Sequence, residues 1–143
     1  MSVNVEVAGQ AALVRIEVIG YENLAANNPS DANWLTCRVE VRVRGFEGHL
    51  NAAFTTQDFA AFSKSLRSAV AALHGWAVFE ADEDALQLKV EFNVTGTVTI
   101  SGSLREPDRP GTYLAFSFES DQTFMSRTVE ALDEVSHRFP VRP

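Results

Sequence analysis

The stretch Trp34-Leu-Thr-Cys-Arg-Val-Glu-Val-Arg-Val43 decides the fold, because apolar and polar residues alternate along it almost without interruption. Apolar side chains occupy one parity from Leu35 onward, and polar or charged side chains occupy the other from Thr36 onward. Successive side chains of a β-strand point to opposite faces. The pattern therefore predicts a strand with one buried face and one wet face.

The same two-residue period recurs through the chain and predicts most of its secondary structure. It is clearest over 86–92 and 114–119, and it opens the chain as a hairpin over 3–7 and 14–18. The full set of expected strands covers residues 3–7, 14–18, 34–44, 46–54, 76–80, 85–94, 98–104 and 113–119. One apolar parity per strand is typical of antiparallel sheets that cover a core with one face.

Two segments have the three- and four-residue spacing of amphipathic helices instead. The first runs from Phe59 to Leu73 after the capping signal at Thr55–Asp58, and His74-Gly75 ends it. The second begins after Asp121 and ends at Pro140. Between the strands, residues 20–31 are rich in turn formers and are expected to form the longest irregular loop.

These elements predict an α+β fold for a single domain spanning residues 1–143. We expect a single, mostly antiparallel β-sheet of about seven to eight strands, with two amphipathic helices packed on one face. The opposite face would then carry an ionic set open to water or to a partner. Its members are Arg38, Glu40, Arg42, Lys89 and Glu91.

Composition narrows the function classes. The chain has 143 residues, 12 basic against 19 acidic, and therefore a net charge of −7, which argues against direct binding to a nucleic-acid backbone. It has no apolar run long enough to cross a membrane and no signal-like start, so a cytoplasmic protein without membrane contact is expected. The single cysteine, Cys37, lies on an apolar strand parity and is expected to be a buried hydrophobe.

No catalytic, cofactor or metal motif accompanies this architecture. The three histidines, His49, His74 and His137, lack metal-ligand spacing, and no nucleophile elbow or phosphate loop is present. Glu119 and Asp121 are close enough in sequence to form an acid–base pair, but a helix-capping aspartate explains Asp121 more simply. We therefore expect no enzyme activity, no cofactor and no bound metal.

A partner-binding surface is the remaining kind of site. By strand parity, Arg38, Glu40 and Arg42 point to the open face of the sheet. Trp34 either points to the same face or lies beneath the long loop. The acidic run Asp82, Glu83 and Asp84 suits a basic protein partner through charge complementarity, although such runs also serve simply as solvated loops.

Several segments resemble the WapI-type family of small bacterial proteins. They are Asn33-Trp34-Leu35 at the start of the alternating strand, Gly45-Phe46-Glu47-Gly48 at its reversal, and Asp121-Gln122-Thr123-Phe124 followed by Phe139-Pro140-Val141. The resemblance runs from about Asp31 to Arg142. It implies an immunity-type role in which the protein neutralises a toxic nuclease domain, and it transfers no catalytic residue.

Three functions follow as hypotheses. The first is a non-enzymatic binding module of immunity type, whose acidic balance suits a basic toxin domain. The second is a small-molecule-binding protein or enzyme with a pocket between sheet and helices, because ten phenylalanines can line an apolar cavity. The third is a homo-oligomer assembled through open sheet edges or the ionic face.

Overall fold

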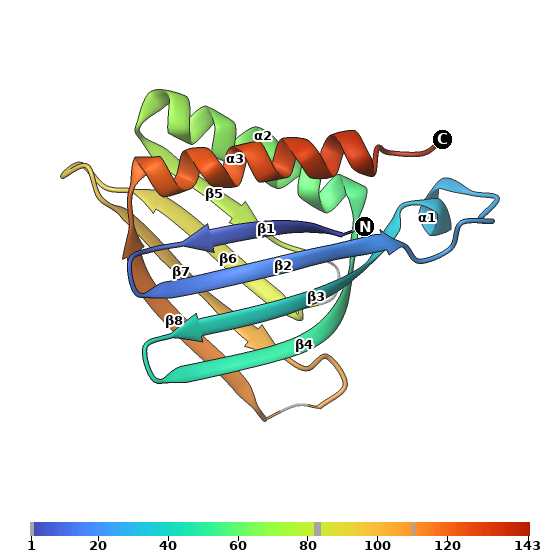
Figure 1. The fold of residues 1–143 in the computed structure, drawn as a ribbon, viewed down its shortest axis with the longest axis horizontal. Coiled ribbons are helices and arrows are strands. Elements are labelled where there is room, and N and C mark those ends of the chain that lie inside the picture. The colour runs from blue at the N-terminus through green and yellow to red at the C-terminus, as the bar shows by residue number, and fades with distance from the viewer. Residues whose placement is uncertain (1, 82–83, 110) are drawn as a thin grey trace.

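The structure is a computed structural model that describes residues 2–81, 84–109 and 111–143. Its elements follow one another as four strands and a helix, twice over, with one short extra helix in the first half (Figure 1). In chain order they are β1 (Val3–Ala8), β2 (Ala12–Tyr21), α1 (Pro29–Ala32), β3 (Trp34–Val43), β4 (Phe46–Thr55), α2 (Thr56–Ala72), β5 (Gly75–Phe79), β6 (Leu86–Phe92), β7 (Val98–Arg105), β8 (Tyr113–Ser120) and α3 (Gln122–Arg138).

The eight strands form two antiparallel four-stranded sheets, ordered β1-β2-β3-β4 and β5-β6-β7-β8. The α+β class and the strand pattern are thus confirmed, but the prediction of a single sheet was wrong. The physical reason lies in the period itself, because one apolar parity per strand fits one covered sheet and two facing sheets equally well. The seventeen-residue α2 separates β4 from β5, which then begins a second meander.

The two long helices lie side by side, as expected, but they do not cover one face of one sheet. Helix α3 lies along β1 and helix α2 lies along β5, so they close the molecule on the side where both sheets begin (Figure 1). Both predicted helix starts are confirmed. Thr55 and Asp58 form a reciprocal capping box at α2, and the Asp121 side chain accepts from the backbone N–H of Phe124 at α3.

One continuous core fills the space between the sheets and the helices. Its centre is a group of fully buried phenylalanines, Phe54, Phe59, Phe62 and Phe79, whose ring centroids lie 5.0–6.1 Å apart where they contact. Most of these contacts are edge-to-face, the arrangement that aromatic quadrupoles favour. These rings pack against one another, so they fill the core and do not line an open ligand cavity.

The predicted irregular segment is confirmed over most of its length, since β2 continues to Tyr21 and only the one-turn helix α1 interrupts the loop that follows. The chain's last residues hold this segment in place. The guanidinium of Arg142 donates to the carbonyl oxygens of Ala32, Leu24 and Asn23, and it stacks 4.0 Å from the ring centroid of Tyr21. One planar side chain thereby ties together three points of the loop.

The buried amide of Asn33 completes this attachment. Its Nδ2 donates to the Arg142 carbonyl oxygen at 3.0 Å, and its Oδ1 accepts from the Arg142 backbone N–H at 2.6 Å. The two bonds act like a pair of sheet hydrogen bonds between the end of the loop and the C-terminal segment. They fix the residue that precedes Trp34, and so they fix where β3 begins.

The outer edge of β1 is covered by hydroxyl groups. Thr128 of α3 donates to the Glu6 carbonyl oxygen at 2.7 Å, and Ser120 at the end of β8 donates to the Ala8 carbonyl oxygen. The following turn fits tightly against β8, because a Cβ built on Gly9 would lie 2.2 Å from the Glu119 carbonyl oxygen. The first sheet is thus joined to α3 and to the second sheet along one edge.

Gly9→Ala should therefore destabilise the fold. The added methyl must displace backbone of β8, and overpacking of this kind costs about 1–3 kcal/mol. Urea denaturation should show this as a lower midpoint with an unchanged m-value. Gly20→Ala is the matched control, since nothing lies within 4 Å of a Cβ built there. Equal midpoints for the two variants would contradict the close approach of Gly9 to β8.

Arg142→Lys should loosen the loop while keeping the positive charge. A lysine cannot reproduce the forked donation to three carbonyl oxygens, and we expect a loss of about 1–3 kcal/mol in unfolding free energy. Limited proteolysis should also cut residues 22–28 faster than in the parent protein. Arg109→Lys, at a side chain that is 82% exposed, should change neither quantity.

Candidate protein-binding surface

The outer face of the first sheet carries a ladder of charged side chains. Strand register places them in rows across the sheet, with Glu6 opposite Arg15 and Arg15 opposite Glu40 in one row, and Glu17 opposite Arg38 in the next. We call this surface the charged face. It comprises Asn4, Glu6, Arg15, Glu17, Arg38, Glu40, Arg42 and Glu47.

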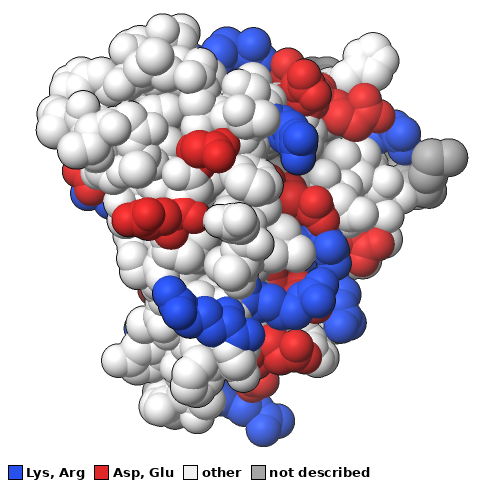
Figure 2. Space-filling model, turned by 60° about the vertical axis from the view of Figure 1, so that its left-hand side comes forward, with Lys and Arg blue, Asp and Glu red and all other residues white. Residues whose placement is uncertain are grey.

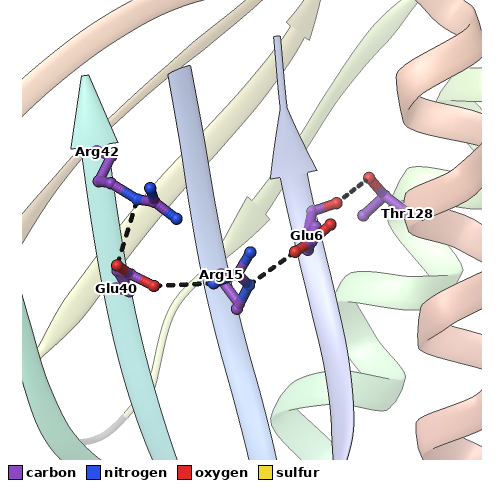
Figure 3. Close-up of polar contacts among 5 residues, drawn as sticks. All are labelled: Glu6, Arg15, Glu40, Arg42 and Thr128. Carbon is purple, nitrogen blue, oxygen red and sulfur yellow. Dashed lines mark hydrogen bonds and ion pairs between the residues drawn. The ribbon is translucent and has the colours of Figure 1, made fainter. Parts of the chain in front are cut away.

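A continuous chain of ion pairs crosses three strands of the charged face (Figure 3). Arg15 Nε lies 2.7 Å from Glu6 Oε2, and Arg15 Nη1 lies 2.9 Å from Glu40 Oε1. The other oxygen of Glu40, Oε2, lies 3.3 Å from Arg42 Nε. Each central group serves two partners of opposite sign, so the chain fixes the side chains of β1, β2 and β3 relative to one another.

The ion pairs change the pKa of Arg15. The hydrogen bond to Glu6 and the Coulombic attraction of both carboxylates raise the pKa of Arg15 above its ordinary value, against partial desolvation, which lowers it. The side chain of Glu40 is 28% exposed, the lowest value among the acidic members of these pairs. Glu40 is therefore the centre of the network.

Arg38 lies on the same face but makes no ion pair within residues 2–81, 84–109 and 111–143. Its side chain is exposed and helps to line a hollow of about 190 Å³, together with Asn4, Arg15, Glu17 and Glu40. A second hollow, beside the β1–β2 turn, is lined in part by Arg42 and Arg44. Figure 2 shows basic side chains as a band across this side of the molecule, with acidic side chains bordering it. Within the described residues, the charged face thus offers Arg38 as a cation without an ion pair beside a fixed network.

The structure places four of the predicted partner-binding residues on one strand and places Asp84 elsewhere. Trp34, Arg38, Glu40 and Arg42 share the outer parity of β3, and Trp34 is half-buried where Arg38 is exposed. Asp84 is exposed, but it belongs to the connection between β5 and β6 of the second sheet. Asp82 and Glu83 lie outside the described residues.

The expectation of one ionic face shared by all strands was wrong for the same reason as the single sheet. Lys89 and Glu91 lie on β6, on the outer face of the second sheet, where their charged groups are 4.0 Å apart. Lys89 also lies 5.7 Å from the ring centroid of the exposed Trp76. The two outer faces are separate surfaces, and the second includes the hydroxyl side chains of Ser101, Ser103 and Ser117 on β7 and β8.

The acidic stretch near the C-terminus is largely paired within the protein. Asp133 on α3 makes an ion pair with Arg67 on α2, and Glu134 lies 3.1 Å from Arg138 one turn later. The first of these pairs joins the two long helices to each other. These carboxylates stabilise the fold and the helix surface, and they do not add to the charged face.

The described residues contain no group of three or more His, Cys, Asp and Glu side chains that could hold a metal ion. Cys37 is buried, as predicted, and burial raises the pKa of its thiol to about 12. It is therefore a neutral core residue at ordinary pH. Asp121 acts as the helix cap at α3. Within the same part of the chain, no helix is both long and apolar enough to span a membrane.

Sequence reasoning missed the part of the charged face that lies on the first hairpin, including Glu6, Arg15 and Glu17. Their strand parities were visible, but the pairing of β2 with β3 places Arg15 beside Glu40, and parity alone does not give that register. It also missed Arg142 and its attachment to the loop. A signal for the hairpin residues existed in their alternating signs, whereas none existed for a contact between residues 109 positions apart.

Comparison with known proteins identifies the family of this chain. Residues 7–140 match the Immunity protein WapI-like family. The chain belongs to this family. The match covers the end of β1, the strands β2 to β8 and both long helices, which confirms the resemblance found in the sequence and extends it toward the N-terminus. No curated protein sequence matches the chain.

The fold of this WapI-like protein is also similar to that of a protein with little sequence identity to it. A solved structure described as "Structure of the plant transcriptional regulator PBF-2" superposes with a TM-score of 0.59 and 10% sequence identity. The alignment covers 97% of this chain and 82% of that one. At this identity the likeness shows a shared fold and nothing about function.

The ion-pair chain gives a testable contrast between two arginines of the WapI-like protein's charged face. Arg15→Met should lower the unfolding free energy by about 1 kcal/mol, since it removes both ion pairs of Arg15 and leaves Glu40 with Arg42 alone. Arg38→Met removes no intramolecular pair and should change stability by less than about 0.5 kcal/mol. In urea denaturation, the difference in unfolding free energy between the two variants should become smaller at 1 M NaCl, because the Debye screening length is then only about 3 Å. A gap that persists unchanged in salt would show that the effect is not electrostatic.

Proposed function

We propose that this protein is a non-enzymatic immunity protein that binds and neutralises a cognate toxin domain. The observation that carries the proposal is the family match over residues 7–140. The lack of any catalytic motif in the sequence is consistent with inhibition by binding alone. In such a mechanism one immunity protein occludes or distorts one toxin, so protection is stoichiometric.

We assign the toxin contact to the charged face, with the half-buried Trp34 at the start of β3 as its aromatic anchor. Interfaces are enriched in tryptophan and arginine, and their energy is concentrated in a few such residues. Arg38 fits this role because its guanidinium is exposed and free of intramolecular ion pairs within the described residues. A toxin carboxylate can therefore bind Arg38 without breaking the Glu6–Arg15–Glu40 network.

The negative net charge of the protein favours a toxin domain that is basic overall. A net charge of −7 steers a cationic partner toward the protein and raises the association rate at low salt. The mixed signs on the charged face then select among basic partners, since a wrong pattern places like charges opposite each other. The acidic Asp84, on the second sheet, contributes to the steering field and lies outside the assigned contact.

We place this interaction in the cytosol, where an immunity protein would meet a toxin that acts inside the cell. The negative charge makes nucleic acid an unfavourable direct ligand. A nuclease toxin would then be inhibited through its own surface, without the immunity protein binding the toxin's substrate.

The test is to search the genes beside this one for a toxin domain and to co-express it with the protein; the absence of any such gene would count against the proposal. Cells producing the toxin alone should die, and cells producing both proteins should survive, with a complex of equal stoichiometry recovered by size-exclusion chromatography. Arg38→Glu and Trp34→Ala should each weaken toxin binding at least about tenfold in calorimetry. Arg109→Glu makes the same charge change at an exposed site in the β7–β8 connection and should bind as the parent does.

Two outcomes separate the parts of the proposal. If the intact protein protects the cells and both face variants bind the toxin normally, the immunity role is supported. The toxin contact then lies on another surface. Failure of the intact protein to bind or protect against the neighbouring toxin domain would contradict the role itself.

A further inference from the structure

The outer edge of β4 has no strand paired with it and no long helix lying along it within residues 2–81, 84–109 and 111–143. Strand β4 is the outermost strand of the first sheet, on the side of the molecule away from the helices (Figure 1). By contrast, α3 lies along β1 and α2 lies along β5. The edge of β8 is closed at one end, where Gly9 lies against the Glu119 carbonyl oxygen and Ser120 donates to Ala8.

Hydrogen-bond alternation shows which backbone groups of β4 point outward. Thr56 N–H donates to the Asn33 carbonyl oxygen at 2.9 Å, in the same register that pairs β4 with β3. In an antiparallel pair, hydrogen-bonded residues alternate with residues whose N–H and C=O point away. The even-numbered residues of β4 therefore bond to β3. The outward groups belong to Glu47, His49, Asn51 and Ala53.

These four residues have no hydrogen-bond partner within the described parts of the chain, and three of them are exposed. Apart from the charged side chain of Glu47, the strand lacks the features that block edge pairing. It runs for ten residues in unbroken register with β3, without proline, lysine or a bulge, and it begins at Phe46, which is 70% exposed. A long, regular, unprotected edge of this kind is a template for another strand.

We propose that the occupant of this edge is a second copy of the same chain, paired antiparallel through β4 about a two-fold axis at Leu50. In that register all four outward residues pair with outward residues. Glu47 lies opposite Ala53 of the second copy and His49 lies opposite Asn51, each pair exchanging two backbone hydrogen bonds. The two first sheets then form one continuous sheet of eight strands.

The side chains of β4 are complementary in this register. On the outer face, no like charges oppose each other, and the His49 ring meets an amide that can donate or accept. On the inner face, the half-buried Leu50 meets its own copy, and the small residues Gly48 and Ala52 face each other on either side of it. The register shifted by two residues would instead place His49 opposite His49 and leave Ala53 without a partner. The strand is thus self-complementary in the register that uses the most hydrogen bonds.

The dimer predicts a specific response to proline at Asn51. Asn51→Pro removes an N–H that bonds only to the second copy, so β3–β4 pairing within each copy is kept. Asn51→Ala retains the N–H and is the matched control. In light scattering with size-exclusion chromatography, up to about 0.5 mM protein, the parent and Asn51→Ala should reach twice the 15.7 kDa monomer mass. Asn51→Pro should raise the dissociation constant at least about tenfold.

A cross-link tests the register without weakening the pairing. Leu50→Cys places two thiols at the two-fold axis, in a non-hydrogen-bonded pair where Cβ atoms approach closely enough for a disulfide. Mild oxidation should give a covalent dimer for Leu50→Cys and none for Glu47→Cys, whose position is remote from its own copy. The buried Cys37 does not compete.

A parent protein that stays monomeric throughout the concentration range overturns the proposal. So does a dimer that Asn51→Pro and Asn51→Ala leave equally intact while both variants remain folded by circular dichroism. Should Asn51→Pro fail to fold, the cross-linking result on Leu50→Cys decides alone. All of these measurements omit the toxin, so they do not bear on the immunity role.

Discussion

The structure depends on one constraint, that every strand has a single face that can be buried. Alternation along the chain gives each of the eight strands an apolar parity, and the apolar faces of two four-stranded meanders share one core. Two facing sheets leave an opening where their first strands diverge, and the amphipathic faces of α2 and α3 fill it (Figure 1). Neither long helix would be stable alone, since helix formation at this length relies on the apolar surface that the sheets provide.

This constraint explains how far sequence reasoning reaches. The period of Leu86–Phe92 translates directly into alternating burial in β6, and the capping residues Thr55 and Asp121 act as their residue types suggest. What the period does not contain is which strand pairs with which. One eight-stranded sheet and two four-stranded sheets have the same alternation of apolar and polar residues along each strand. The division into two sheets is therefore decided by tertiary packing.

The candidate surface follows the same rule. Strand parity placed Arg38, Glu40 and Arg42 together on one strand, and the structure keeps them so. Which of these residues form ion pairs depends on the neighbouring strand. Arg15 of β2 pairs with Glu40, whereas Arg38 lies opposite Glu17 and makes no ion pair within the described residues. Arg142 shows the extreme case. Its anchoring of the loop depends on the end of α3 reaching the start of β3, which no local spacing encodes.

The charged face and the β4 edge are adjacent but chemically distinct surfaces, and this separation matters for binding. The ion pairs of Glu6, Arg15, Glu40 and Arg42 are ones that a partner would have to break, whereas Arg38 and Glu17 make none within the described residues. The β4 edge instead offers backbone groups, which recognise any extended strand and gain selectivity only from the side chains beside them. Pairing two copies there would place both charged faces on the same side of one continuous sheet, because a two-fold axis perpendicular to a sheet preserves its faces. A dimer of this form would present two toxin-binding surfaces in a common plane, each complete within its own chain, so that neutralisation would remain one toxin per copy whether or not the copies are paired.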